Sequence, residues 1–213
     1  MKARIAFLLL LLLSCCVLAQ EAGNTQKPPV EQWDDNFDGT ALGPRWEKFS
    51  FEGPSAANVE VKDGVLRIRG VENGRAGVRT SQVLHSDRFI FEAVLAGLPK
   101  PFNQPTGFAS LAVLFDSSGR NRIEWILRSD GMFEAWYVKD GRGERLDNSR
   151  MATKETTPTL GIVRRGDTIM FVLNGEVGIQ RKFKAMPSDF TVMLYGWGNS
   201  ESYWDSVRLV TAK

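Results

Sequence analysis

The sequence predicts an all-β domain built as a sandwich, or jelly roll, of two antiparallel sheets. About a dozen short segments have the alternation of apolar and polar residues that is typical of strands. Turns rich in Gly, Pro and Asn separate these segments, and no long segment carries apolar residues at helical spacing. The clearest alternation lies in the middle of the chain, within Arg120–Val138.

This central stretch predicts a hairpin with one buried face. Residues 122–128 place Ile123, Trp125 and Leu127 on one parity, and residues 129–131 supply a Ser-Asp-Gly turn. We expect the apolar parity to be buried, with core positions at Phe91, Trp125, Phe133 and Tyr137. The opposite face then carries Arg122, Glu124, Arg128, Glu134 and Trp136. A tryptophan among charged groups suits either sugar binding or a solvated face held by cross-strand ion pairs.

Other strands are expected on both sides of this hairpin. Five strands are predicted before the central hairpin: two that form a hairpin with its turn at Asp63-Gly64, and three more. Their ranges are Asn58–Val61, Val65–Arg69, Gly77–Gln82, Phe89–Leu95 and Phe108–Phe115. After it, Arg142–Thr157 is expected to be a polar connection. The remaining predicted strands, with a turn at Asn174-Gly175, are Thr159–Arg164, Thr168–Leu173, Glu176–Phe183, Phe190–Trp197 and Tyr203–Val210.

The N-terminus has the pattern of an export signal. Residues 1–19 combine Lys2 and Arg4 with an apolar run and small residues, and the run is too short for an ordinary membrane span. We therefore expect a signal peptide at 1–19, a flexible tether at 20–32 and one domain at 33–213, secreted or periplasmic. An alternative cleavage site resembles a lipobox and would leave a lipid anchor on Cys15, which makes a lipoprotein the alternative location.

Composition narrows the class of protein. A chain of 213 residues that is 43% hydrophobic suits one domain with a large core. Both cysteines, Cys15 and Cys16, lie in the signal, so no disulfide is expected in the domain. Loss of Lys2 and Arg4 with the signal leaves 25 basic and 25 acidic residues, which argues against nucleic acid and against an anionic membrane surface as partners. With His85 as the only histidine, no Cys/His metal cluster is expected.

Several short motifs resemble those of family 16 glycoside hydrolases, which belong to the concanavalin A-like lectins and glucanases. The front half of that family is matched by Asn36-Phe37-Asp38, Arg45-Trp46-Glu47, Asp63–Leu66 and Arg79-Thr80-Ser81. The back half is matched by Asn174-Gly175-Glu176, Leu194–Trp197 and Trp204–Arg208. The resemblance implies a jelly roll of two curved antiparallel sheets whose concave face holds sugar. It covers nearly the whole chain after the signal.

The chain departs from this family at the catalytic positions. The enzymes carry a Glu-x-Asp-x-Glu run on the central concave strand, and retaining hydrolysis needs two carboxyl groups about 5–5.5 Å apart. The matching positions here are Arg122, Glu124 and Ile126, so only the middle carboxylate remains. Glu134 on the neighbouring strand is the one candidate for a second carboxylate. The sequence therefore argues against hydrolysis of the family type.

The expected function depends on the side chains of the concave face, which the resemblance and the alternation within the strands identify. The expected glycan-binding residues are Arg79, Arg122, Glu124, Trp136, Tyr195 and Trp197, and we expect Arg79, Arg122, Glu124 and Trp136 to share one open surface. The first interpretation is an exported, non-hydrolytic carbohydrate-binding domain. The alternatives are a divergent polysaccharide hydrolase or lyase using Glu124, with Glu134 in the hydrolase, and a structural or adhesion module of the cell envelope.

A structural calcium ion is the last expectation from the resemblance. The family's ion joins the N-terminal and C-terminal strands through two carbonyls and one aspartate. The resemblance assigns these roles to the carbonyls of Asn36 and Gly64 and to the carboxylate of Asp205. Calcium accepts such a mixture of oxygen ligands, whereas an Asp205 that pairs with an arginine is the alternative. No organic cofactor is expected.

Overall fold

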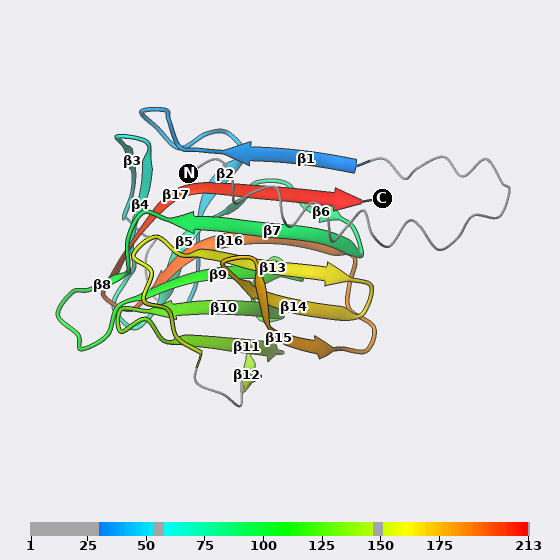
Figure 1. The fold of residues 1–213 in the computed structure, drawn as a ribbon. Coiled ribbons are helices and arrows are strands. Elements are labelled where there is room, and N and C mark those ends of the chain that lie inside the picture. The colour runs from blue at the N-terminus through cyan, green and yellow to red at the C-terminus, as the bar shows by residue number, and fades with distance from the viewer. Residues whose placement is uncertain (1–29, 53–57, 147–150, 213) are drawn as a thin grey trace, which may run out of the picture.

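The computed structural model describes residues 30–52, 58–146 and 151–212. Over these ranges the chain forms two antiparallel sheets stacked face to face, and it contains no helix (Figure 1). Accordingly, no described segment is a helix capable of crossing a membrane. The prediction of an all-β sandwich of two antiparallel sheets is confirmed.

The nine-stranded sheet has the order β15–β14–β13–β7–β17–β4–β3, with β1 and β8 also paired to β17. Its strands are β1 (Val30–Asp35), β3 (Asn58–Lys62), β4 (Val65–Arg69), β7 (Arg88–Leu95), β8 (Lys100–Pro101), β13 (Thr159–Arg165), β14 (Thr168–Leu173), β15 (Glu176–Lys182) and β17 (Ser200–Ala212). The long β17 pairs with β4 over its first part and with β1 over its second.

The eight-stranded sheet has the order β12–β11–β10–β9–β16–β5–β2, and the short β6 pairs with β16. Its strands are β2 (Trp46–Glu52), β5 (Arg75–Thr80), β6 (Leu84–His85), β9 (Phe108–Leu114), β10 (Arg122–Arg128), β11 (Phe133–Lys139), β12 (Arg142–Arg145) and β16 (Asp189–Trp197). The central hairpin predicted from the alternation is β10–β11, and it lies toward one edge of this sheet.

The two ends of the domain lie side by side. Strand β1 runs antiparallel to β17, with Val30 opposite Ala212 and Asp35 opposite Val207. The strand thus begins at Val30, three residues inside the predicted tether of residues 20–32. The predicted signal peptide, the rest of the tether and Cys15 lie outside the described residues.

Two-residue turns connect several hairpins. Asp63-Gly64 has φ angles of 53° and 71°, and Asn174-Gly175 has 51° and 87°, so both have positive φ at each position as a type I′ turn requires. The polar connection predicted for Arg142–Thr157 is wrong at its start, because Asp140-Gly141 forms a turn with positive φ and leads into β12. The sequence analysis also predicted no strand at Trp46–Glu52, where the structure has β2.

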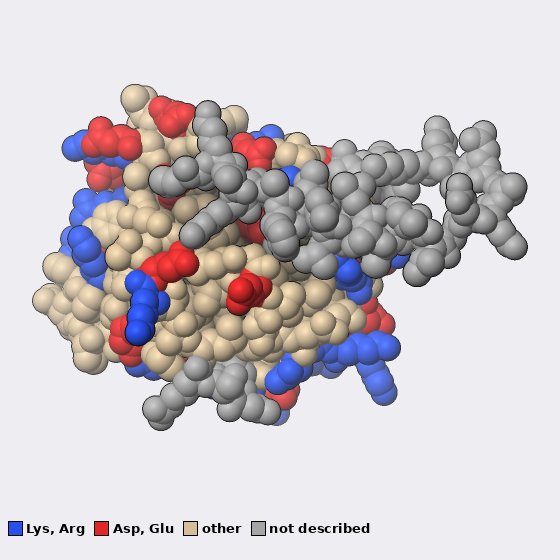
Figure 2. Space-filling model, viewed as in Figure 1, with Lys and Arg blue, Asp and Glu red and all other residues tan. Residues whose placement is uncertain are grey.

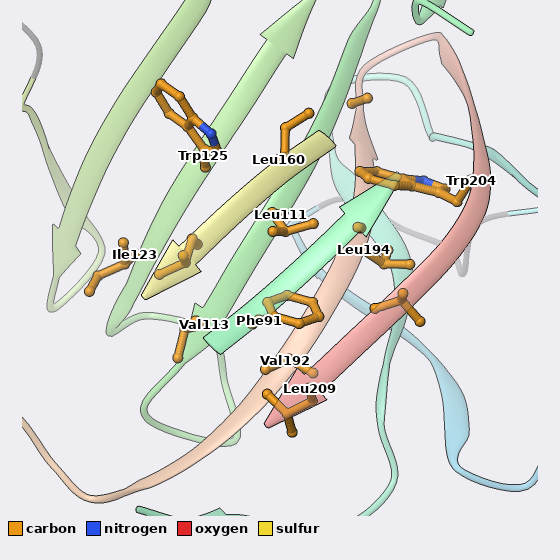
Figure 3. Packing of buried hydrophobic residues seen from close by; sticks show 14 of the residues in the cluster. Phe91, Leu111, Val113, Ile123, Trp125, Leu160, Val192, Leu194, Trp204 and Leu209 are labelled. Atoms are coloured by element: carbon orange, nitrogen blue, oxygen red, sulfur yellow. The ribbon is translucent and has the colours of Figure 1, made fainter. Parts of the chain in front are cut away.

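The core lies between the sheets and is built from large side chains of both (Figure 3). Trp125 is fully buried, stacks on Phe133 with centroids 5.0 Å apart, and donates from Nε1 to the Val172 carbonyl of the opposite sheet at 3.0 Å. Phe91 is fully buried as expected, whereas Tyr137 is only half-buried and packs against Phe183 at the sheet edge. Because Trp125 points inward, its neighbour Glu124 lies on the outer face of the eight-stranded sheet.

Candidate functional site

The candidate site is the outer face of the eight-stranded sheet, here called the Glu124 face. Cross-strand register places Glu124 opposite both Trp136 and Ala112, and it places Met193 opposite both Ala112 and Arg79. Directly opposed residues of a sheet share a face. By the same rule this face holds every residue of the predicted glycan-binding set: Arg79, Arg122, Glu124, Trp136, Tyr195 and Trp197.

Glu124 lies at the centre of a buried cluster of charges. Its Oε1 accepts hydrogen bonds from Arg122 Nε and from the Tyr195 hydroxyl, the latter at 2.8 Å. Arg75 Nε lies 3.7 Å from the same oxygen. Burial raises the pKa of the Tyr195 hydroxyl, and the negative charge of Glu124 adds to the rise, so this hydroxyl remains a donor. One carboxylate is thus held by two guanidinium groups and a phenol.

The expectation of one open surface shared by Arg79, Arg122, Glu124 and Trp136 is wrong. The side chains of Arg122 and Glu124 are only 4% and 2% exposed, and Tyr195 is fully buried. The cover comes from Phe51 of β2, whose ring lies 5.5 Å from that of Tyr195 and 4.4 Å from the Arg122 guanidinium carbon.

The loop between β9 and β10 closes this part of the face further. Arg122 donates from Nη1 to the Gly119 carbonyl at 2.7 Å, and Arg79 donates to the Ser117 carbonyl at 2.9 Å. Arg79 also pairs with Glu47 at 2.6 Å and packs over Phe49. These contacts hold the β9–β10 loop and the edge strand β2 against the rest of the sheet. Arg79 and Arg122 therefore have a structural role.

Glu134 belongs to a second, more open cluster. It lies diagonal to Glu124 across the β10–β11 ladder, because its direct partner is Ile126. Arg128 Nη1 lies 3.3 Å and Arg145 Nη1 3.7 Å from its Oε1, and Trp136 Nε1 donates to its Oε2 at 3.0 Å. Each of the two carboxylates therefore has its own arginine partners.

The open part of the Glu124 face is a row of aromatic and basic side chains across β10, β9, β16 and β5. Arg128 lies opposite Phe108, and Trp197 lies opposite Arg75. The rings of Phe108 and Trp197 are 4.7 Å apart, Arg75 lies 5.6 Å from the Trp197 centroid, and Trp197 is 41% exposed. We call these four residues the aromatic row. Trp136 is half-buried and closely approached by Gly143 of the edge strand β12, so it is less accessible than Trp197.

Sequence reasoning missed three members of this row, Arg75, Phe108 and Arg128, as binding candidates. The parity of β10 already gave Arg128. Arg75 and Phe108 could have been found from their positions, because each is the first residue of its strand. Trp197 is the last residue of the antiparallel strand between them, so all three lie at the same end of the sheet.

The residues expected to hold calcium meet at a junction in the nine-stranded sheet, away from the Glu124 face. Pairing of β17 with β4 ends at Trp204 and pairing with β1 begins at Val207, so Asp205 lies at the change of neighbour, beside a β-bulge. Asn36 follows the end of β1, and Gly64 precedes the start of β4. The register thus brings all three residues to one place.

The junction also contains a carboxylate that sequence reasoning missed. Asn36 Nδ2 donates to Asp38 Oδ2, and a Cβ added to Gly64 would lie 3.4 Å from Asp38 Oδ1. No group of three or more His, Cys, Asp or Glu side chains suited to a metal is found among the described residues. Two carboxylates with two carbonyls still fit calcium, which accepts mixed oxygen ligands and water.

Comparison with known proteins gives the fold and no closer relationship. No protein-family model and no curated protein matches the chain. Solved structures do match: SCLam, a non-specific endo-β-1,3(4)-glucanase from family GH16, aligns with a TM-score of 0.64 and 12% identity over 88% of this chain and 94% of that one. An endo-β-1,3-glucanase from Pyrococcus furiosus gives 0.62 and 12% over 85% and 94%. The carbohydrate-binding module CBM66 from Bacillus subtilis gives 0.57 and 11% over 77% and 94%.

These neighbours confirm the predicted fold class, a concanavalin A-like β-sandwich of the kind found in family 16 glycoside hydrolases and related β-glucanases. At such identities the likeness extends to the fold alone.

Proposed function

We propose that this chain is an exported carbohydrate-binding domain that holds a glycan on the Glu124 face without hydrolysing it. The observation that carries the proposal is the exposed ring of Trp197, placed beside Phe108 and flanked by Arg75 and Arg128. A flat ring offers a stacking surface for a pyranose, and guanidinium groups offer planar donors to its hydroxyls. An indole with this exposure, on the same sheet face as the buried Glu124 cluster, has the character of a binding anchor.

The structural neighbours support a carbohydrate ligand. By their names, two are endo-glucanases and one is a carbohydrate-binding module, and all three share this sandwich. The chain therefore has a scaffold on which both binding and hydrolysis of glycans occur, and its own residues must decide between them.

The charge arrangement favours binding over hydrolysis. Retaining hydrolysis requires one carboxylate free to attack the sugar and a second, protonated carboxyl about 5–5.5 Å away. Glu124 is buried under Phe51 and already accepts from Arg122 and Tyr195. Glu134 pairs with Arg128 and Arg145 and accepts from Trp136. Two carboxylates so engaged with cations are poor candidates for a nucleophile and an acid.

Binding of structural calcium at the β1–β4–β17 junction is part of the proposal. The carbonyls of Asn36 and Gly64 and the carboxylates of Asp38 and Asp205 would hold the ion. Bound there, it would supply charge neutralisation and a link between the two ends of the chain, with no part in ligand chemistry.

A glycan array with the purified protein tests the proposed function, followed by calorimetry on each hit. Replacing Trp197 with alanine should weaken binding by more than about tenfold, because an exposed aromatic anchor is lost. Its melting temperature should remain close to that of the wild type. Val177→Ala is the control, since Val177 is also an exposed apolar residue but lies on β15 of the other sheet.

Turnover is measured in parallel, as new reducing ends and as the ultraviolet absorbance of unsaturated uronates. We expect no product from any glycan that binds. Product formation that Glu134→Gln abolishes would establish the enzyme instead. An array without hits would leave the envelope-module alternative.

A further inference from the structure

A large groove in the described part of the chain lies away from the Glu124 face. It has a volume of about 870 Å³ and lies at one end of the nine-stranded sheet, between the β3–β4 hairpin and the segment 96–101. In the view of Figure 1 this is the end at which β3, β4 and β8 meet, and Figure 2 shows charged side chains gathered there while the middle of the sheet face carries few. The groove is built mainly on strands of the nine-stranded sheet, whereas the aromatic row lies on the eight-stranded sheet.

The floor of the groove is a fixed aromatic side chain. Tyr203 of β17 lies opposite Arg67 of β4, and its hydroxyl donates to Glu201 Oε2 at 2.6 Å. Arg67 Nη2 lies 2.7 Å from the other oxygen of Glu201, and Arg67 Nη1 lies 3.5 Å from Glu60. The Tyr203 and Arg67 bonds hold the pKa of Glu201 below its usual value, so the carboxylate stays charged and the ring stays oriented.

The walls of the groove supply two ammonium groups. Lys62 and Lys100 both line it, and neither forms an ion pair with any side chain in residues 30–52, 58–146 or 151–212. Lys100 Nζ lies 5.2 Å from the centroid of the Tyr203 ring. Asp63 is the acidic lining residue that Arg67 does not engage. The hydroxyls of Ser129 and Thr156 complete the polar lining.

We propose that this groove is a second glycan site, specific for acidic sugar residues such as uronates. A pyranose ring stacks on Tyr203, and Lys62 and Lys100 bind its carboxylate. Lys100 covers the ring in the free protein and exchanges this cation–π contact for an ion pair with the ligand. An acidic peptide has the charge but no sugar ring to stack on Tyr203, so the aromatic floor favours a saccharide. The site is independent of the proposed function at the Glu124 face.

The test is calorimetry of the purified protein with hexamers of galacturonate, mannuronate and glucuronate, each compared with its neutral parent hexamer. At least one acidic hexamer should bind, and binding should weaken as salt is added, because ion pairs at a surface are screened. Tyr203→Ala should weaken it by about tenfold or more, while Tyr203→Phe, which keeps the ring, should weaken it much less.

Lys100→Ala is the most informative variant, because it exposes the Tyr203 ring and at the same time removes an ammonium group. Acidic hexamers should bind it about three- to tenfold more weakly, and any weak binding of neutral hexamers should be unchanged or stronger. Lys184→Ala at the opposite end of the same sheet is the control for loss of one surface charge. Melting curves identify a variant that fails to fold.

Trp197→Ala separates the two sites. It should retain binding of acidic hexamers at the groove even if it loses the ligand of the Glu124 face. The proposal is overturned if no acidic hexamer binds, if the Tyr203 and Lys100 variants bind as the wild type does, or if only Trp197→Ala abolishes binding. Equal loss of acidic and neutral hexamers in Lys100→Ala would also overturn it, and binding of a poly-glutamate peptide in preference to the hexamers would assign the groove to acidic peptides.

Discussion

Truncation of Glu124 should destabilise the protein far more than truncation of Glu134. Both carboxylates lie on the same sheet face and each pairs with two arginines, so the pair forms a matched comparison. They differ in burial. Glu124 and Arg122 are 2% and 4% exposed, whereas Glu134, Arg128 and Arg145 are 15%, 32% and 43% exposed.

The magnitude follows from what each truncation leaves behind. Glu124→Ala removes the carboxylate that pairs with the buried Arg122 guanidinium, and breaking a buried pair in this way costs about 3–5 kcal/mol. Glu134→Ala leaves arginines that can turn to water, and an exposed pair contributes about 0–1 kcal/mol. For a domain of this size, about 1 kcal/mol lowers the melting temperature by roughly 2–4 °C. The expected losses are therefore roughly 6–20 °C for Glu124→Ala and at most roughly 4 °C for Glu134→Ala.

Thermal melts and urea unfolding of the two variants, measured beside the wild type, give these values. Glu124→Leu adds a further comparison, because it replaces the carboxylate with an apolar group of similar volume and removes the same ion pair with Arg122. It should also lose stability. If Glu124→Ala melts within about 2 °C of the wild type, the loss is below roughly 1 kcal/mol, and the view of Glu124 as a structural counter-ion is refuted.

Two further predictions concern pH and calcium. Burial raises the pKa of Glu92 on β7, although Arg208 opposite it acts to lower it, so folding favours the protonated carboxyl. The stability that Glu92 contributes is therefore full below the unfolded-state pKa and lost as pH rises through the folded-state pKa. Glu92→Gln should accordingly gain stability over the wild type at pH 7 and lose that gain near pH 4, measured by urea unfolding; an equal difference at both pH values would contradict this. Calcium should raise the melting temperature relative to chelator, and Asp205→Ala should remove the increase; identical curves for the wild type would leave Asp205 without a metal role.

Much of the fold could be predicted because its signals are local. Period-two alternation located Arg122–Arg128, and positive-φ dipeptides such as Asp63-Gly64 located hairpin turns. Strand β12 was missed because all four of its residues are exposed, so it has no apolar alternation. Its turn, Asp140-Gly141, carried the only local signal.

The candidate site could be predicted only as far as the parity of its strands. Parity correctly gave the face on which Glu124 and Trp197 lie, because one register step decides the face for a whole strand. The burial of Glu124 was not predictable in this way. It depends on Phe51 and on the Gly119 carbonyl, which approach from β2 and from a loop, and no local pattern encodes such long-range contacts.

The residues that flank Glu124 support the proposal of a glycan-binding face over that of a hydrolase site. A buried carboxylate must be neutralised, and Arg122, two residues along the same strand from Glu124, supplies the charge. Ile126 on the other side offers no proton to a leaving group. The side chains that stabilise Glu124 thereby contact its Oε1 and reduce its capacity to act as a nucleophile. What the face still presents to a ligand is the exposed ring of Trp197 at its open end, and in the proposed function a sugar would stack on that ring, which supplies no group to break a glycosidic bond.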